Sequence, residues 1–109
     1  MSGWEPVARL SDLDDGAMKQ VRVGDEPVGL YRVGGDVYAL TDICTHEHAY
    51  LTEGDFEAED YEVECPLHGS RFDVRDGSVR ILPATKPAAT YSVRIEGDEV
   101  LIAPRDTKE

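Results

Sequence analysis

Cysteine is scarce in this chain, and long apolar runs and an excess of basic residues are missing. Only 2 of its 109 residues are cysteines. The longest stretch without Asp, Glu, Lys or Arg runs from Pro87 to Val93, which is far too short to cross a bilayer. Acidic residues outnumber basic ones by 23 to 11, and the formal net charge is −12. Because the apolar runs are short, we expect no membrane partner. Because phosphate binding needs a Lys/Arg surface, we also expect no nucleic-acid partner.

A secretory signal and a catalytic set are also missing from the sequence. Acidic residues near its start, such as Glu5 and Asp12, interrupt any apolar run, so we expect a cytoplasmic protein. No nucleophile stands with a partner base, and no phosphate-binding loop is present. The length predicts a single domain, residues 1–109.

Short β-rich runs separated by turn residues dominate the chain. No long helical period is present, and residues 11–16, which include helix-cap and turn residues, are expected to form at most one helical turn. This pattern predicts an all-β fold, a β-sandwich or partly open barrel. Residues 42 to 79, approximately, are expected to form a small lobe inserted between strands of the main β unit. Strands are expected at 4–9, 18–23, 28–33, 37–40, 61–64, 71–74, 91–95 and 100–103.

Each of the two cysteines is followed closely by a histidine. The first group is Cys44-Thr45-His46, and the second is Cys65-Pro66-Leu67-His68. Two thiolates and two imidazoles presented by two loops make a four-ligand metal site. A structural disulfide would use both thiols and leave the two histidines unexplained. We therefore predict that Cys44, His46, Cys65 and His68 are metal ligands.

Two metal centres are compatible with this ligand set. Zinc also binds two cysteines and two histidines, but zinc-finger spacing usually pairs Cys with Cys and His with His. Here each loop supplies one of each, which favours a 2Fe–2S cluster with both thiolates on one iron and both imidazoles on the other. His48 is a possible substitute for His46 as the partner of Cys44. We assign His48 to solvent and expect His46 to be the ligand.

The sequence resembles the Rieske ferredoxins of bacterial aromatic-ring-hydroxylating dioxygenase systems, close to the carbazole and biphenyl dioxygenase types. The resemblance covers nearly the whole chain and is carried by the two ligand loops, by Gly54, and by the run that continues through Ser70-Arg71-Phe72-Asp73. It implies a Rieske fold with one 2Fe–2S cluster at a tip and both histidine edges near solvent. The implied protein is a monomeric electron carrier, not an enzyme. It would take single electrons from an NADH-dependent flavin reductase to a terminal Rieske oxygenase.

Departures from the high-potential respiratory Rieske proteins indicate the reduction potential. Those proteins carry a disulfide between the loops, whereas this chain has Leu67 at the second-loop position and no cysteine after His46. They also have a tyrosine that donates to a cysteine sulfur, where this chain has Phe72, although Ser70 is retained. We expect a potential between 0 and about −150 mV, the lower half of the Rieske range.

Other roles are open at the level of sequence. The same cluster could serve as the small subunit of an assimilatory nitrite reductase, and a zinc site would make the chain a binding module without a redox role. The acidic stretch from Glu53 to Glu64 either docks basic partners or is a solvated connecting face.

Overall fold

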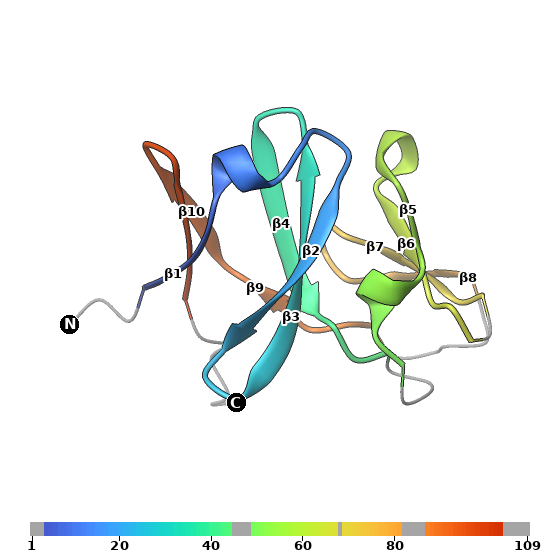
Figure 1. The fold of residues 1–109 in the computed structure, drawn as a ribbon. Coiled ribbons are helices and arrows are strands. Elements are labelled where there is room, and N and C mark those ends of the chain that lie inside the picture. The colour runs from blue at the N-terminus through green and yellow to red at the C-terminus, as the bar shows by residue number, and fades with distance from the viewer. Residues whose placement is uncertain (1–3, 45–48, 68, 82–86, 104–109) are drawn as a thin grey trace.

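The computed structural model describes residues 4–44, 49–67, 69–81 and 87–103 (Figure 1). Within these ranges the chain forms β-strands and three single turns of 3-10 helix, with no α-helix. None of the described helices is long and apolar enough to span a membrane. The predicted all-β class is therefore confirmed.

Eleven strands in the described part of the chain form three open antiparallel sheets. The strands are β1 (Glu5–Arg9), β2 (Met18–Val23), β3 (Glu26–Val33), β4 (Asp36–Thr41), β5 (Asp55–Glu57), β6 (Glu62–Glu64), β7 (Arg71–Asp73), β8 (Val79–Ile81), β9 (Thr90–Tyr91), β10 (Val93–Glu96) and β11 (Glu99–Ile102). The three sheets have the orders β1-β11-β10, β2-β3-β4-β9 and β5-β6-β7-β8. The 3-10 turns are η1 (Leu10–Asp12), η2 (Leu51–Glu53) and η3 (Ala58–Asp60).

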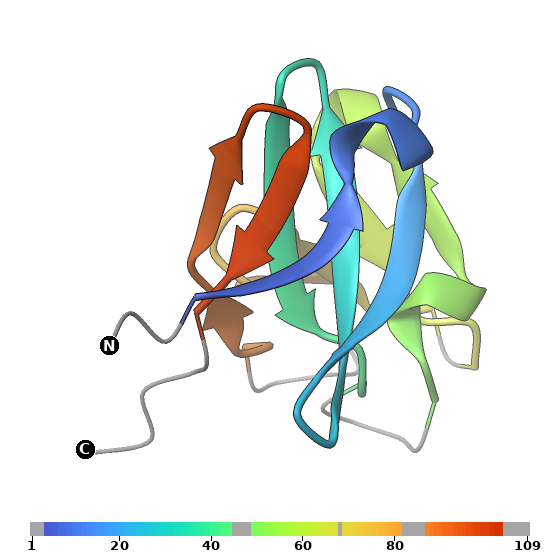
Figure 2. The same cartoon turned by 60° about the vertical axis from the view of Figure 1, so that its left-hand side comes forward.

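The central sheet β2-β3-β4-β9 is covered on both faces. Figures 1 and 2 show it between the β1-β11-β10 sheet and the β5-β6-β7-β8 sheet. Strand β3 has buried residues on both of its faces, which explains why its sequence reads as a continuous apolar run rather than an alternating one. A positive φ at Gly34, 62°, forms the hairpin turn between β3 and β4, a conformation that glycine adopts without steric cost.

Two hydrophobic clusters fill the spaces on either side of the central sheet. The first, which we call the platform core, contains Leu13, Val21, Val23, Val28, Leu30, Val37, Ala39, Tyr91, Val100 and Ile102. The second, the lobe core, contains Tyr31, Leu40, Cys44, Leu51, Val63, Cys65, Phe72, Val74 and Ala88. Both cysteines therefore lie in the core that joins the central sheet to the β5-β6-β7-β8 sheet.

The β5-β6-β7-β8 sheet is inserted in the sequence between β4 and β9. Strands β4 and β9 pair directly, with Leu40 opposite Thr90, and Thr41 donates its N–H to the carbonyl of Ala89 at 2.9 Å. The chain thus leaves the central sheet after β4 and returns to the same place after the inserted segment. Figure 1 shows this sheet on one side of the molecule, away from β1 and β10.

The sequence prediction was wrong about the run 91–95 and incomplete in the lobe. The run was expected to be one strand, but it divides at Ser92: Tyr91 ends β9 beside β4, and Val93 begins β10 beside β11. Alternation continues through the change of sheet, so the pattern alone cannot reveal it. Strands β5 and β8 were not expected, because acidic residues lower the β propensity of the first and the second is only three residues long.

Candidate metal centre

The first ligand loop begins and ends on a short antiparallel ladder. Cys44 donates its N–H to the carbonyl of Ala49 at 2.9 Å, and Ile43 forms a β-bridge with Tyr50. The side chain of Cys44 is buried, with 3% of the residue exposed. His46 and His48 lie outside the described residues. The ladder brings the two ends of the loop, Cys44 and Ala49, together beside the buried thiol of Cys44.

The buried carboxylate of Asp42 holds this ladder in place through hydrogen bonds to neighbouring segments. It is fully buried and accepts three hydrogen bonds: from the Thr52 N–H at 2.8 Å, the Thr52 hydroxyl at 2.6 Å and the Gln20 side-chain amide at 2.7 Å. Its backbone carbonyl also accepts the N–H of Leu51 at 2.8 Å. A buried polar group needs such partners, because leaving it unsatisfied is costly. Asp42 therefore joins β2, the end of β4 and η2 around the base of the first loop.

The second ligand loop is a tight turn between β6 and β7. The N–H of Cys65 donates to the carbonyl of Ser70 at 2.8 Å, and the N–H of Gly69 donates to the carbonyl of Cys65 at 3.1 Å. Gly69 has φ +76°, in the left-handed region that favours glycine. Cys65 is 1% exposed, whereas Leu67 is 56% exposed. His68 lies outside the described residues. The turn thus keeps the thiol inside the lobe and part of its tip in solvent.

A close backbone approach at Gly54 holds η2 against the second loop. A Cβ at this position would collide with the carbonyl oxygen of Glu64, the residue before Cys65. The N–H of Gly54 also donates to the carbonyl of Leu51 at 2.9 Å, which closes the 3-10 turn. Only glycine lets these two segments approach so closely.

Ion pairs connect the strands of the lobe. The Arg71 guanidinium contacts Glu64 at 3.0 Å and Glu62 at 3.3 Å, which joins β6 to β7. The nearly buried Asp73 pairs with Arg75 at 2.8 Å and with Arg80, on β8, at 2.7 Å. Hydrogen bonds from Arg75, and then from Arg80, hold the pKa of the Asp73 carboxyl well below its usual value of 3.8.

Arg75 also packs on an aromatic ring. Its guanidinium carbon lies 4.2 Å from the ring centroid of Tyr61, a cation–π geometry. Tyr61 itself has the positive φ of 58°, at the end of η3. The contact ties the turn after β7 to the start of β6. With the ion pairs it braces the lobe.

The described part of the ligand set fits a thiolate-bound metal centre. Neither Cys44 nor Cys65 is in a disulfide, and both are buried in the lobe core. Buried thiols that are not joined in a disulfide are suited to hold a soft metal such as iron–sulfur iron. Within the described ranges no three His, Cys, Asp or Glu side chains gather into a metal site, and the two predicted histidine ligands stand outside those ranges. The assignment of all four ligands therefore stays a prediction.

Several residues at the site were missed by sequence reasoning. Asp42 and Thr52 form the base of the first loop, and Arg71, Arg75 and Arg80 brace the lobe. Their bonds to residues on other strands leave no local pattern in the sequence. Asp76 accepts the N–H of Ser78 at 2.9 Å, in the turn between β7 and β8.

Comparison with known proteins identifies the family to which this chain belongs. The family model described as "Rieske [2Fe-2S] domain" matches residues 3–92. A ferredoxin component of the naphthalene 1,2-dioxygenase/salicylate 5-hydroxylase systems of Ralstonia sp is 39% identical over 99 residues, 91% of this chain and 93% of that protein. An anthranilate 1,2-dioxygenase ferredoxin subunit of Burkholderia cepacia is 33% identical over 100 residues, 92% of this chain and 91% of that protein.

Among solved structures, the ferredoxin of carbazole 1,9a-dioxygenase from Nocardioides aromaticivorans IC177 superposes with a TM-score of 0.92. It is 42% identical, and the match covers 95% of this chain and all of that one. The loops, the fold and these similarities agree with one another. The chain belongs to the Rieske [2Fe-2S] family, with a 2Fe–2S cluster as its cofactor, and within that family to the ferredoxins of aromatic dioxygenase systems.

Proposed function

We propose that this protein carries single electrons from an NADH-dependent flavin reductase to the terminal oxygenase of an aromatic-ring dioxygenase system, and that it is not itself an enzyme. The proposed cluster ligands are Cys44, His46, Cys65 and His68. The observation that carries the proposal is that two buried thiols, neither of them in a disulfide, lie in one core at the starts of two loops whose ends are held by backbone hydrogen bonds. Such a site suits a resident redox centre.

A bound 2Fe–2S cluster with two imidazole ligands supplies one-electron chemistry at about −150 to +300 mV, against about −400 mV for all-cysteine plant-type clusters. The protein's contribution is to hold the ligands and exclude water. Burial keeps the thiols of Cys44 and Cys65 in the lobe core, away from solvent. Exposed Leu67, in the second loop, gives a partner protein direct access to the ligand loops. Phe72 is fully buried and brings no hydroxyl to the site, which supports a low potential within the Rieske range.

A complex formed by a relative supports the proposed class of acceptor. A solved complex of reduced oxygenase and oxidised ferredoxin in carbazole 1,9a-dioxygenase contains a ferredoxin 36% identical to this chain, with a TM-score of 0.89. We propose the same class of acceptor here, with a flavin-dependent reductase as donor. We further propose that the protein is a cytoplasmic monomer, a single domain of residues 1–109 with its cluster lobe at about 42–79.

The dioxygenase role is preferred to that of a nitrite reductase subunit or a zinc module. The curated relatives reported above, at 33% and 39% identity, are both dioxygenase ferredoxins. The zinc alternative predicts a colourless protein, whereas a Rieske cluster gives a red-brown one.

Reconstitution tests the proposal. The holoprotein should contain iron and acid-labile sulfide, and after reduction by dithionite it should give a Rieske EPR signal. With the reductase and oxygenase of the Nocardioides carbazole system, it should support NADH-dependent substrate oxidation. His46→Ala and His68→Ala should abolish the EPR signal, while His48→Ala should keep it. Zinc in place of iron, or loss of the signal in His48→Ala alone, would overturn the assignment.

A further inference from the structure

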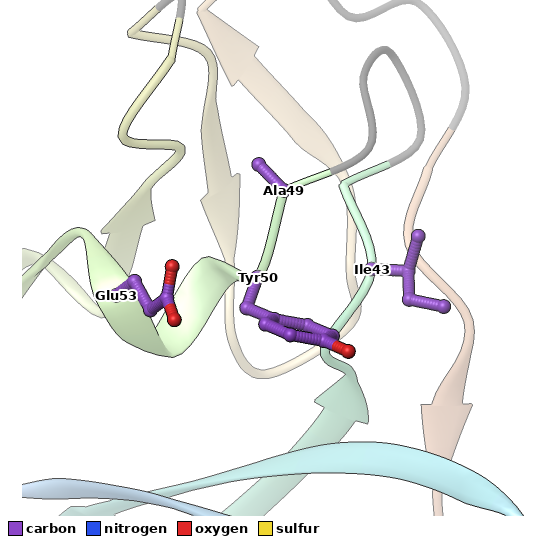
Figure 3. Close-up of a pocket in the computed structure, with 4 residues that line it drawn as sticks. All are labelled: Ile43, Ala49, Tyr50 and Glu53. Atoms are coloured by element: carbon purple, nitrogen blue, oxygen red, sulfur yellow. The ribbon is translucent and has the colours of Figure 1, made fainter.

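An open, largely apolar groove lies against the base of the first ligand loop. It has a volume of 330 Å³ and is lined by Ile43, Ala49, Tyr50 and Glu53. Figure 3 shows the Tyr50 ring between Glu53 on one side and Ile43 on the other. Ile43 precedes Cys44, and Ala49 accepts the N–H of Cys44. The groove is therefore lined by residues of the same ladder that closes the first ligand loop.

Two of the groove's side chains are unusually exposed for their size. Ile43 is 42% exposed and Tyr50 is 37% exposed, and they face the same groove across a β-bridge. Within the described ranges only two other large apolar side chains, Leu67 and Ile81, are classed as exposed. Neighbouring exposed apolar groups mark interaction surfaces more often than isolated ones do, and tyrosine is enriched at the centre of protein interfaces.

The groove is held rigid by contacts on its inner side. Thr52, next to Glu53 in η2, is fastened to buried Asp42 by two hydrogen bonds, and Gly54 packs on the backbone of Glu64. A surface that does not rearrange on binding loses little conformational entropy when a partner docks. The backbone on the inner side of the groove is thus fastened to the core, and Ile43 and Tyr50 are joined to each other by the β-bridge.

The negative charge beside the groove indicates which kind of partner surface would bind there. Glu53 lines the groove and also a second hollow of 220 Å³, which it shares with Asp55, Glu64 and Cys65. Glu64 is paired with Arg71, but no ion pair within the described part of the chain reaches Glu53 or Asp55. These carboxylates favour a cationic group on the partner. A second copy of this chain, with a net charge of −12, would place like charges together.

We propose that this groove is a docking surface for the terminal oxygenase, which inserts an aliphatic or aromatic side chain between Ile43 and Tyr50 and places a Lys or Arg against Glu53. The inference rests on the proposed function and adds to it the contact residues and the chemistry of the partner surface. Docking here brings the partner next to the ends of the first ligand loop, which carries Cys44. The apolar insertion sets the lifetime of the complex, and the charge pair raises the rate of encounter.

The test measures electron transfer from reduced holoprotein to the terminal oxygenase of the Nocardioides carbazole system by stopped flow. Ile43→Ser and Tyr50→Ser should each lower the second-order rate constant about fivefold or more, as expected for truncation at the centre of an interface. Leu101→Ser is the matched control, since Leu101 is half-buried on β11 and belongs to neither core cluster. It should leave the rate constant within about twofold, a change too small for an interface residue.

The charge contribution is tested by an isosteric pair. Glu53→Gln should lower the rate constant at low ionic strength and flatten its dependence on salt. Glu99→Gln, on the remote β1-β11-β10 sheet, changes the net charge by the same amount and should do neither. The reduction potential and EPR spectrum of every variant should match those of the wild type, which separates a docking defect from a damaged cluster.

The outcomes distinguish the inference from the function on which it rests. Wild-type holoprotein that passes no electrons to the oxygenase would overturn the proposed function and this inference with it. Unchanged rate constants in the groove variants, with an active wild type, would overturn the docking surface alone. Slower reduction by the reductase, with an unchanged rate to the oxygenase, would also overturn it, because the occupant would then be the reductase.

Discussion

Thr52 donates twice to Asp42, with its backbone N–H at 2.8 Å and its hydroxyl at 2.6 Å. The pair connects the end of β4 to η2, which lie on opposite sides of the first ligand loop. The amide of Gln20, on β2, completes the set at 2.7 Å. The position of Cys44 thus depends on a carboxylate two residues before it that has no contact with solvent.

Asp42→Ala should destabilise the protein and speed the loss of its cluster. The substitution removes the acceptor of three hydrogen bonds, two from half-buried Thr52 and one from exposed Gln20, at about 0.5–1.5 kcal/mol for each bond. Urea unfolding and the decay of visible absorbance at constant temperature measure the two effects. Asp25→Ala, at an exposed turn position, is the control and should change neither. Equal cluster lifetimes in the two variants would contradict the role given to Asp42.

Tyr31→Phe should leave the free energy of unfolding unchanged or raise it. The Tyr31 hydroxyl is buried and has no hydrogen-bond partner among the described residues. Burial, and then the charge of Asp42, raise the pKa of this phenol well above its ordinary value, so it stays neutral. Removing an unsatisfied buried hydroxyl recovers up to about 1–3 kcal/mol of desolvation cost.

Tyr91→Phe supplies the contrast to Tyr31→Phe. The Tyr91 hydroxyl donates to the carboxylate of Glu26, so its removal should lower the free energy of unfolding by about 1–2 kcal/mol. Denaturant titration of both variants makes the comparison. A larger loss for Tyr31→Phe than for Tyr91→Phe would show that the Tyr31 hydroxyl has a partner after all.

Asp73→Asn should destabilise the lobe at neutral pH by about 1.5–3 kcal/mol, the range for hydrogen bonds to charged groups. The folded-state pKa of Asp73 lies well below the ordinary value of 3.8, because Arg75 and Arg80 donate to the carboxylate. Its contribution is therefore fully present above the unfolded pKa and is lost as the pH falls toward the folded one. The difference in unfolding free energy between wild type and variant should stay constant from about pH 7 to about pH 5 and shrink as the pH falls below about 4. A constant difference would contradict the ion-pair origin.

Gly54→Ala should reduce both the stability and the yield of cluster-loaded protein. The added Cβ would collide with the Glu64 carbonyl, and a backbone atom cannot move aside as a flexible side chain can. Overpacking of this kind costs about 1–3 kcal/mol or more. Gly35→Ala is the matched control, since nothing lies within 4 Å of its Cβ position and its φ is not in the left-handed region. Iron content per protein and thermal unfolding measure the difference.

A redox titration should give a midpoint potential between 0 and about −150 mV. The reason is the absence of a hydroxyl at Phe72, together with a second loop in which Leu67 stands where respiratory proteins have a disulfide cysteine. A value above about +150 mV would contradict this expectation.

Sequence reasoning found the local features of this protein and missed the ones that depend on distant partners. The two ligand loops are short motifs, and the strand 18–23 appears with its predicted bounds as β2. The sequence did not reveal the structural role of Asp42, because its partner Gln20 is 22 residues away. Strand β8 exists because Val79 and Ile81 pair with β7, which a three-residue pattern cannot indicate. Ile43 and Tyr50 were missed for the same reason: only the bridge between them makes a groove.

The pairing of β4 with β9 makes the whole segment from Asp42 to Ala89 an oversized hairpin loop. Its two ends meet at neighbouring positions of one sheet, Leu40 opposite Thr90. A short turn could span the same gap and leave the strand order β2-β3-β4-β9 intact. The cluster-binding segment is in this sense an insertion, because the strand connectivity of the central sheet does not require it.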